Sequence, residues 1–323
     1  MRKEIVNAVL ALTIVTGTIA AFPFVKQLDK SEAKAEFSDL TDSDIAENNA
    51  EIEINDNSII ESRILSKAVD VNAASKDDVY HMMLNSIDYY DKVSGTMLFT
   101  LGNTDFINVV DFQCSLSDSA AYSDYAQYRV DNVKSVTYDN IKEYECTAHQ
   151  EIFCDPNLTA HVNLAERQYE FEDRSVTTLD NVVHIPDEER FKIGKDGRAE
   201  VCYVADPTNV YMSNHCLFPQ ELTLGYLHDQ SLWEIVGTTN CNGRICYVIE
   251  GVPTPEYGEK LNVSNFSFWV DAQTGVLVRY EGYDKAGNIS GMMYTENLKF
   301  EENAESINSF NIDSIKDYKE IKQ

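Results

Sequence analysis

The feature that most restricts the fold is a series of short strand-like segments in the last third of the chain, joined by tight turns. Two turns end in glycine, Ala272-Gln-Thr-Gly275 and Asp284-Lys-Ala-Gly287, and a third is Asn242-Gly243. Such turns join antiparallel neighbours, because Asn and Gly tolerate the positive φ values that hairpins need. We therefore predict consecutive strands of one sheet at Leu232–Thr239, Ile245–Gly251, Asn265–Asp271, Val276–Tyr283 and Ile289–Phe300.

The segment Asn265–Asp271 shows how this sheet is oriented. Phe266 and Phe268 share one face, with Ser267 and Trp269 on the other, because alternate residues of a strand point to opposite sides. Trp269 on the otherwise polar side indicates that this side is covered too. A sheet covered on both faces is consistent with one that curls around a helix.

A helix is predicted before the strands. Ser75 can cap it, two aspartates follow in the first turn, where negative charge is favourable, and apolar residues recur every three or four positions up to Tyr90. Its apolar stripe includes Met82 and Met83. Methionine side chains at this spacing suit either the core or the wall of a lipid pocket.

The middle of the chain has the pattern of a meandering antiparallel sheet, with short segments rich in Val, Tyr, Phe and Thr separated by Asp, Asn, Gly and Ser. One helical insertion is predicted at Pro219–Leu227, with the proline near its first turn. The predicted strands of this region are 96–101, 107–114, 126–130, 135–138, 151–154, 167–171, 198–204 and 209–212.

The C-terminal segments carry a resemblance. A Trp-Val-Asp strand, a Thr-Gly turn, a Tyr-Asp-Lys-Ala-Gly-Asn turn and a last strand follow one another in Phe268–Asn288 and Thr295–Phe300. In this order they resemble the meander of the lipoprotein-carrier superfamily, which includes LolA-like carriers and RseB-like regulators. The match covers residues 232–300 and extends to the helix at 77–90. The resemblance implies an α+β fold: a strongly curved antiparallel half-barrel sheet with helices covering its concave side.

The resemblance also implies a function. It implies a non-catalytic binding protein for a lipid, an acyl chain or a lipidated protein, held in the apolar hollow of a curved sheet. No individual ligand contact of the family can be placed on this sequence; the candidates for lining a pocket are Met82, Met83, Phe266, Phe268 and Trp269. A membrane-tethered module that binds protein or senses a signal, as in RseB-like proteins, is the alternative.

The N-terminus has the pattern of an export segment. A mostly apolar run from Ile5 to Val25 follows Arg2 and Lys3. At about 1.5 Å per residue the run can cross the hydrocarbon core, and the basic residues predict that the remainder emerges outside. Cleavage near Ala33-Lys-Ala35 would give a secreted protein. Retention would anchor the chain on the outer face of the cytoplasmic membrane.

Residues 36–75 are poor in aromatic residues and rich in Asp, Glu, Asn and Ser. Such a segment buries too little apolar surface to offset its ordering entropy, so we predict an acidic flexible spacer with a short helix around Ser58–Val69. The predicted order is a signal peptide or anchor at 1–35, this spacer at 36–75, a LolA-like curved-sheet domain at 76–303 and a tail at 304–323.

Charge and motifs exclude several classes of function. The formal net charge of −28 disfavours nucleic acid, whose binding depends on clustered Lys and Arg. The expected partners are an apolar ligand or a lipidated protein, and the membrane through an uncleaved N-terminus. The chain lacks G-x-S-x-G, H-E-x-x-H, Walker and dinucleotide motifs. We therefore predict no catalytic residue, metal ligand or cofactor, and an exported hydrolase is the less favoured reading.

Seven cysteines in an exported chain favour disulfides. Only Cys241 and Cys246 lie close in sequence, on either side of the Asn242-Gly243 tip. A four-residue loop would place them face to face and allow a disulfide. A two-residue loop would place Cys241 opposite Arg244 and leave the two cysteines as diagonal neighbours, too far apart for easy bonding.

Overall fold

The computed structural model describes residues 74–102, 105–174, 178–195 and 199–321. The chain divides into two compact units, Glu53–His184 with Val204–Gln323, and Met1–Ile52 with Ile185–Tyr203. The predicted export segment, its cleavage site, most of the acidic spacer and the short helix at 58–69 lie outside the described residues. Within them, no helix is long and apolar enough to span a membrane.

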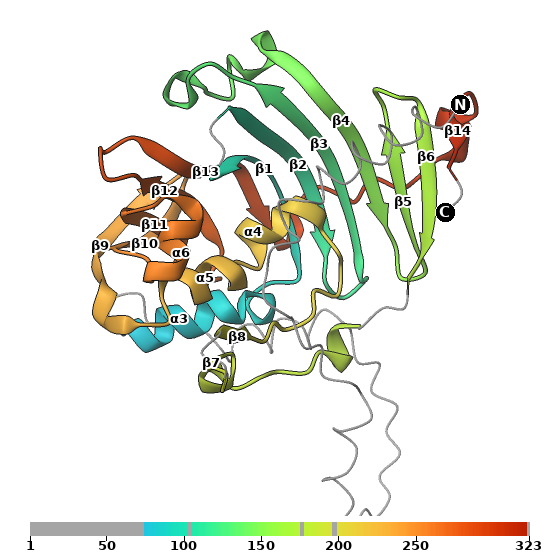
Figure 1. Ribbon diagram of the computed structural model, residues 1–323. Helices are drawn as coiled ribbons and strands as arrows, with labels where there is room; N and C mark the ends of the chain where they lie inside the picture. Colours follow the sequence, from blue (N-terminus) through green and yellow to red (C-terminus); the bar gives the residue numbers. More distant parts are fainter. Residues whose placement is uncertain (1–73, 103–104, 175–177, 196–198, 322–323) are drawn as a thin grey trace, which may run out of the picture. The chain divides into compact units, whose positions relative to one another are not determined.

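The larger unit is built on one open, mostly antiparallel sheet of 12 strands (Figure 1). Its order is β14-β6-β5-β4-β3-β2-β1-β13-β12-β11-β10-β9, and only β14 pairs in parallel, with β6. The edge strands are β9 and β14, so the sheet is not closed. The strands are β1 (Lys92–Leu101), β2 (Phe106–Ser115), β3 (Ala120–Arg129), β4 (Glu145–Cys154), β5 (Leu158–Asn163), β6 (Gln168–Asp173), β9 (Trp233–Cys241), β10 (Arg244–Gly251), β11 (Asn265–Asp271), β12 (Leu277–Tyr283), β13 (Ile289–Phe300) and β14 (Lys319–Glu320).

The predicted C-terminal meander is confirmed, since β9 to β13 are consecutive neighbours in the sheet. Local side chains close its turns. The Asp271 carboxylate accepts hydrogen bonds from the backbone N–H groups of Gln273 and Thr274, at 3.1 and 2.9 Å. In the next turn Asp284 accepts from the N–H groups of Ala286 and Asn288, at 2.8 and 2.7 Å. Aspartates that bond to the backbone two to four residues ahead fix such turns.

The helix predicted to begin at Ser75 is confirmed as α3 (Lys76–Leu84), with a capping box between Ser75 and Asp78. It ends at Leu84 rather than near Tyr90, with Asn85 as its C-cap; the backbone N–H and the side chain of Asn85 both donate to the carbonyl of His81 at 3.0 Å. Asparagine competes with the backbone in this way and so favours helix ends. A short 3-10 turn, Ser86–Asp88, follows.

Two predicted strands are wrong. Residues 135–138 and 209–212 overlap the 3-10 turns Val133–Ser135 and Tyr211–Ser213. Aspartate and asparagine close the chain locally there: Asn132 accepts from the N–H of Lys134, and Asp206 accepts from the N–H of Val210. The sequence analysis also missed β5 and the largely exposed helix α6 (Pro255–Leu261).

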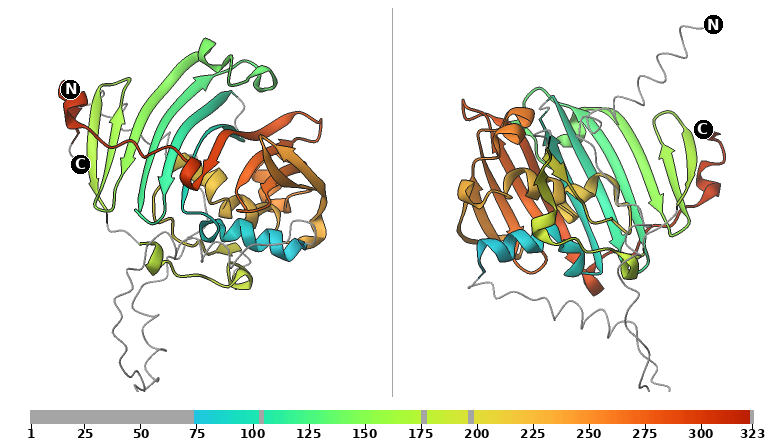
Figure 2. Two further views of the ribbon diagram at one scale, coloured as in Figure 1. Left: turned by 180° about the vertical axis from the view of Figure 1, so that it is seen from behind. Right: turned by 60° about the horizontal axis from the view of Figure 1, so that its bottom comes forward.

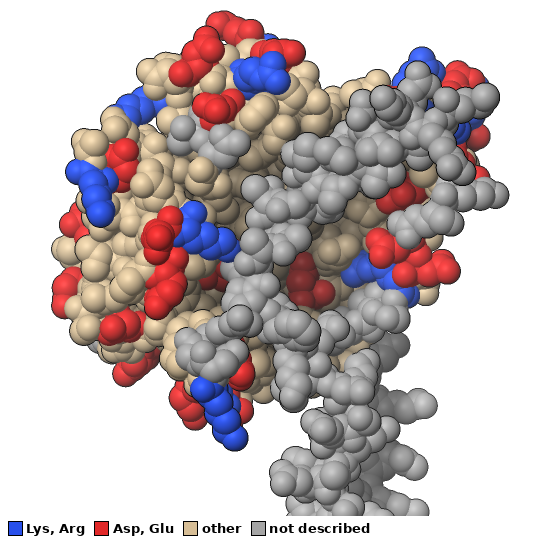
Figure 3. Space-filling model, viewed as in Figure 1, with Lys and Arg blue, Asp and Glu red and all other residues tan. Residues whose placement is uncertain are grey.

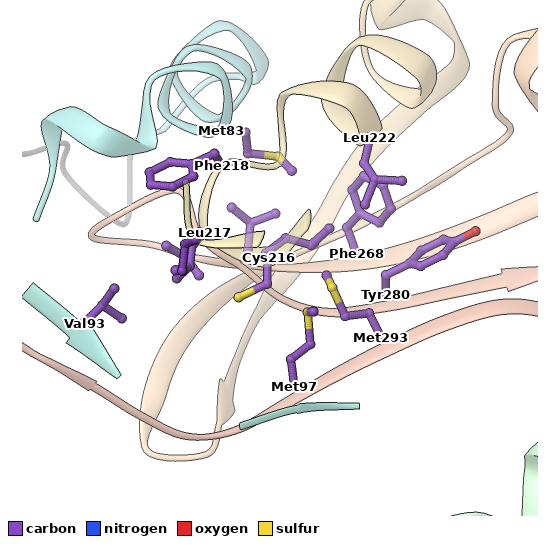
Figure 4. Packing of buried hydrophobic residues seen from close by; sticks show 14 of the residues in the cluster. Met83, Val93, Met97, Cys216, Leu217, Phe218, Leu222, Phe268, Tyr280 and Met293 are labelled. Atoms are coloured by element: carbon purple, nitrogen blue, oxygen red, sulfur yellow. The ribbon is translucent and has the colours of Figure 1, made fainter. Parts of the chain in front are cut away.

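Three helices lie within the curve of the sheet, α3, α4 (Asn214–Leu217) and α5 (Gln220–Tyr226) (Figures 1 and 2). The helix predicted at Pro219–Leu227 is therefore confirmed as α5. Side chains from these helices pack onto the strands, as Met83, Leu217 and Phe218 do toward Met97 and Met293 (Figure 4). Each such side chain contributes about 1.5–3 kcal/mol when fully buried. The concave side of β1 and β11–β13 is thus a packed core.

The outer, convex side is also covered in two places. The loop at 130–144 places Val133, Val136 and Ile141 over Leu98 and Met292. Farther along the sheet, the C-terminal segment packs the ring of Phe310 against Phe153 and Phe171, at 5.5 and 5.4 Å between centroids. The segment then ends in β14 beside β6, so residues of the predicted tail take part in the sheet.

The described part of the smaller unit is short. β7 (Phe191–Ile193) pairs antiparallel with β8 (Ala199–Val201), and β8 overlaps the strand predicted at 198–204. The Arg190 guanidinium donates to the carbonyl of Ile185 at 3.2 Å, and the backbone N–H of Cys202 donates to the carbonyl of Arg190 at 2.9 Å. These bonds hold the ends of the small hairpin.

Candidate functional site

The concave face of β2 to β6 is the candidate site, because it continues the apolar core into a polar surface. The ring of Phe99 lies 5.7 Å from that of His215 in α4, which places Phe99 on the concave side. Directly paired residues share a face, so the row Phe99, Asn108, Gln127 and Ala148 crosses this side from β1 to β4.

The neighbouring row shows the change in polarity most clearly. It begins with Val110, which is fully buried, and passes through Tyr125 to Gln150, Asn163 and Gln168. The ring of Tyr125 is itself covered on the concave side, edge-on to Tyr211 at 5.7 Å. Apolar contact therefore gives way to amide side chains between β3 and β4.

A third row repeats the trend and adds charge. Phe112 is buried, Ile152 is buried, and His161 and Glu170 follow on β5 and β6. Burial lowers the pKa of His161, although Glu170 and Glu172 oppose that effect. We call the concave-facing residues of β2–β6, together with Tyr211 and Met212, the concave platform.

A network of neutral hydrogen-bonding groups occupies the centre of the concave platform. Asn108 Oδ1 accepts from the Tyr125 hydroxyl at 2.9 Å and from Gln127 Nε2 at 3.1 Å. Burial raises the pKa of Tyr125 and lowers the pKa of His215, so the phenol stays protonated and the imidazole neutral near pH 7. The platform can therefore bind by hydrogen bonds and apolar contact.

Cys146 and His149 have the residue types of a nucleophilic pair, but each has another partner. The Cys146 thiol donates to the carbonyl of Ala148 at 3.3 Å, whereas His149 Nε2 lies 2.8 Å from Asp124 Oδ1. A Cys–His dyad needs a direct bond between the two side chains. Among the described residues, no group of three or more His, Cys, Asp or Glu side chains could hold a metal ion.

The residues proposed from the sequence as pocket lining fall into two groups. Met82, Met83, Phe266 and Phe268 are at most 2% exposed, and Met83, Phe266 and Phe268 belong to one packed cluster of the core. Trp269 lies on the opposite face, where the Arg279 guanidinium stacks on it at 4.6 Å. The structure therefore brings Met83, Phe266 and Phe268 together and separates Trp269 from them. Their role in ligand binding stays a prediction.

Arg279 organises the outer face of β11–β13. Its guanidinium also stacks on Tyr294 at 4.8 Å and forms an ion pair with Glu281. Glu281 accepts from the hydroxyl groups of Tyr294 and Tyr283. Burial would raise the pKa of Glu281, but the hydrogen bonds from Tyr283, Arg279 and Tyr294 outweigh it and lower that pKa. Arg279 and Glu281 thus cover the Trp269 side of the sheet, as its sequence position suggested.

The register of β9 and β10 decides between the two loops considered for the cysteine hairpin. Cys241 pairs with Arg244, and Asn242 and Gly243 both have positive φ, 53° and 85°. This is the two-residue turn of type I′, so the four-residue loop that would set the cysteines face to face is wrong. Cys241 and Cys246 are diagonal neighbours and both are free thiols.

A polar hollow of about 390 Å³ lies on the convex face. Asp111, Asp124, Lys299 and Glu305 contribute charges to its lining. A ligand pocket for an acyl chain is lined mainly by apolar side chains, so this hollow does not suit such a ligand. Over the face shown in Figure 3, acidic and basic side chains lie interspersed.

No family model and no curated protein matches the sequence. Solved structures similar to the chain include a crystal structure of MucB, with 14% identity over 75% of this chain and 62% of that one, and a TM-score of 0.35. The chain thus spans less than two thirds of the length of MucB.

Two others are a putative outer membrane lipoprotein-sorting protein domain from Vibrio parahaemolyticus (11% identity, 75% of this chain, 100% of that one, TM-score 0.24) and LprF from Mycobacterium bovis (9%, 71%, 98%, 0.32). Their TM-scores lie below 0.5, and the fold described above rests on strand order and register.

The sequence analysis missed the concave platform, although it placed several of its residues in strands. Gln150, Asn163 and Gln168 are ordinary polar strand residues when read along the chain. They become one surface only through the pairing of β3, β4, β5 and β6. One local signal was present in β4, where Ile152 and Cys154 lie two positions apart and therefore point to the same side of the sheet.

Proposed function

We propose that this is a non-catalytic binding protein, working outside the cytoplasmic membrane, that holds a lipidated protein on the concave platform. The observation that carries the proposal is the change along paired rows from buried apolar residues on β2 to amide and acidic residues on β5 and β6. A lipidated polypeptide has the same order of polarity, an acyl chain followed by hydrogen-bonding backbone.

The apolar end supports the acyl chain. Ala148, Tyr211 and Met212 are partly buried and pack against the core, so they offer apolar surface that is still reachable from the platform. An acyl chain gains about 0.8 kcal/mol for each CH₂ group that it buries. Burial of the acyl chain would therefore favour a lipidated ligand over the same polypeptide without the lipid.

The polar end supports the adjoining polypeptide. Gln150, Asn163 and Gln168 each carry both donors and an acceptor, which match the N–H and C=O groups of an extended backbone. The acidic residues Glu170 and Glu172 add a preference for basic peptide side chains. The polar end suits a peptide even without an acyl chain. A protein-interaction or signal-sensing module without an acyl ligand is therefore the second candidate.

The proposed location rests on the N-terminal pattern. Arg2 and Lys3 followed by the apolar run Ile5–Val25 support export. The mature N-terminus, read by mass spectrometry of the protein from its native host, separates the two forms. A start at residue 36 supports a released carrier, whereas an intact run supports a tethered sensor.

Fluorescence anisotropy with three probes tests the proposed ligand. The full chain is titrated with a fluorescent palmitoylated peptide, the same peptide without the acyl chain, and a fluorescent fatty acid. The proposal expects the palmitoylated peptide to bind most tightly. Equal binding of the two peptides would favour the protein-interaction module, and failure of all three probes would refute a role in binding lipidated protein.

A matched pair of variants locates the site. Ala148→Glu places a charge at the apolar end of the concave platform and should weaken binding of the palmitoylated peptide by about tenfold or more, equivalent to about 1.4 kcal/mol. Val236→Glu makes the same kind of change at a 54% exposed position on the edge strand β9 and should leave binding unchanged. Equal losses in both variants would place the site elsewhere.

A further inference from the structure

The tip of the β9–β10 hairpin holds two thiols that the proposed binding function does not use. Cys241 is partly exposed, whereas Cys246 is buried. Cys241 pairs with Arg244, and Cys246 lies two residues beyond Arg244. The two cysteines therefore lie on the same face of the hairpin as diagonal neighbours, although they do not pair directly in the register.

We propose that Cys241 and Cys246 form a reversible dithiol–disulfide site, in which the exposed Cys241 reacts with small disulfides and the buried Cys246 resolves the product. The assignment of roles follows from exposure. A disulfide from solution can reach the Cys241 sulfur, while Cys246 can be reached only by a sulfur already at the hairpin. The site is independent of the concave platform, which lies on the other face of the sheet.

The surroundings favour a reactive thiolate at Cys241. The neighbouring Cys246 thiol lowers the pKa of Cys241 to about 7, burial opposes this, and the charge of Arg279 lowers it further. Conversely, the neighbouring Cys241 and burial raise the pKa of Cys246. The thiolate is the nucleophile in thiol–disulfide exchange, so the proton stays on Cys246 until Cys241 has reacted.

Arg279 is fixed in place rather than free to move away. It is held between the rings of Trp269 and Tyr294 and paired with Glu281. A cation held by two rings and a carboxylate keeps its position when the nearby sulfur changes charge. Arg279 is therefore a positioning residue for the Cys241 thiolate.

The exchange balances in two steps. The Cys241 thiolate attacks one sulfur of a small disulfide such as oxidised glutathione, forms a mixed disulfide and releases one thiolate. The Cys246 thiol then loses its proton to solvent and attacks the Cys241 sulfur, which forms the Cys241–Cys246 disulfide and releases the second thiolate. The protein loses two electrons, and the small disulfide is reduced to two thiols.

The hairpin geometry makes this bond reversible. Diagonal residues lie farther apart than directly paired ones, so closing the bond requires the tip to shift. The side chain of Asn242 resists such a shift, because its Nδ2 donates to the carbonyl of Thr295 at 2.8 Å. A disulfide that holds its backbone under strain is more easily reduced.

The other cysteines do not share this arrangement. Cys114 and Cys216 are buried, and burial raises the pKa of both thiols, that of Cys216 to about 12. Cys146 is exposed, as an attacking thiol must be, and donates to the carbonyl of Ala148. Cys146 therefore serves as a control that separates the effect of exposure from the effect of the Cys241–Cys246 arrangement.

The test uses the reduced full chain, oxidised glutathione at pH 7.5 and mass spectrometry of the intact protein and its peptides. The wild-type chain should form the Cys241–Cys246 disulfide and lose it again when reduced glutathione is added. Cys246→Ser should instead accumulate a glutathione adduct on Cys241. Cys241→Ser should leave Cys246 unmodified over the same time, and Cys146→Ser should behave as wild type.

A second measurement remains informative if a variant folds poorly. The rate of alkylation of Cys241 by iodoacetamide in the wild-type chain should rise with a midpoint near pH 7, and Arg279→Gln should shift the midpoint upward. A midpoint near 8.5, the value of an ordinary thiol, would overturn the proposal. So would glutathione addition to Cys146 in preference to Cys241, or a Cys246→Ser chain that collects no adduct.

Discussion

Two tyrosine hydroxyl groups at the centre of the core offer a sharp test of how buried polar atoms contribute to stability. Tyr226 in α5 and Tyr280 in β12 are both fully buried, and their hydroxyl oxygens lie 2.6 Å apart. The rings around them belong to Phe266 and Phe268. The perturbation is the removal of one hydroxyl or of both, by Tyr226→Phe, Tyr280→Phe and the double variant.

The expected magnitude follows from what each change leaves behind. Either single variant strands one hydroxyl among aromatic rings, which should cost about 1–3 kcal/mol of the free energy of unfolding. The double variant removes both polar atoms and leaves a phenylalanine pair, so it should be close to neutral. The coupling energy between the two substitutions should therefore equal the sum of the two single costs, about 2–6 kcal/mol, with the double variant more stable than that sum predicts.

The assay is urea unfolding followed by tryptophan fluorescence. Trp233 is a suitable probe, because its ring is buried and its Nε1 donates to the carbonyl of Leu227 just after α5, at 2.9 Å. Tyr144→Phe is the control: its hydroxyl is 3.5 Å from Ser135 Oγ at the surface, and its loss should change the free energy by less than about 0.5 kcal/mol. Additive single effects in the double variant would refute the reasoning.

Two further outcomes follow from the turns and the charges. Gly275 and Gly287 share a positive φ, 73° and 79°, but a Cβ at Gly275 would clash with the backbone of Met82 in α3, whereas one at Gly287 meets nothing within 4 Å. In urea unfolding, Gly287→Ala should lower the free energy of unfolding by about 1–2 kcal/mol, because of the backbone conformation alone. Gly275→Ala should lower it by about 1–3 kcal/mol more, because of the clash with Met82. Equal losses would contradict the contact. Hydrogen bonds lower the pKa of Glu281 in the folded protein. Ionised Glu281 therefore stabilises the fold above its unfolded pKa of about 4.3, and this stabilisation is lost as the pH falls through the folded pKa. Thermal unfolding of Glu281→Gln between pH 2 and 7 should therefore show a smaller acid dependence than wild type, and an unchanged dependence would disprove the linkage.

The local structure of the C-terminal half could be predicted from residues close together in the sequence. Asn265–Asp271 and Ile289–Phe300 were located to the residue, and the capping box at Ser75 marked the start of α3. These features depend on residues a few positions apart: a turn closed by its own aspartate, a helix capped by its own serine, and alternation along one strand. The same reasoning failed at residues 135–138 and 209–212, where Asn132 and Asp206 bend the chain and β-forming residues such as Val136 and Tyr211 suggested strands.

Which residues face one another depends on how distant strands pair, and this was not predictable from the sequence. β1 pairs with β13, which joins residues near Val93 to residues near Phe300 and sets the course of the whole sheet. The polar rows of the concave platform and the diagonal placement of Cys241 and Cys246 both follow from registers of this kind. Shifting a strand by one residue exchanges its faces, and the energy that selects one register comes from packing between distant segments. That energy cannot be assigned from residues close together in the sequence, so the binding surface appears only once the strands are paired.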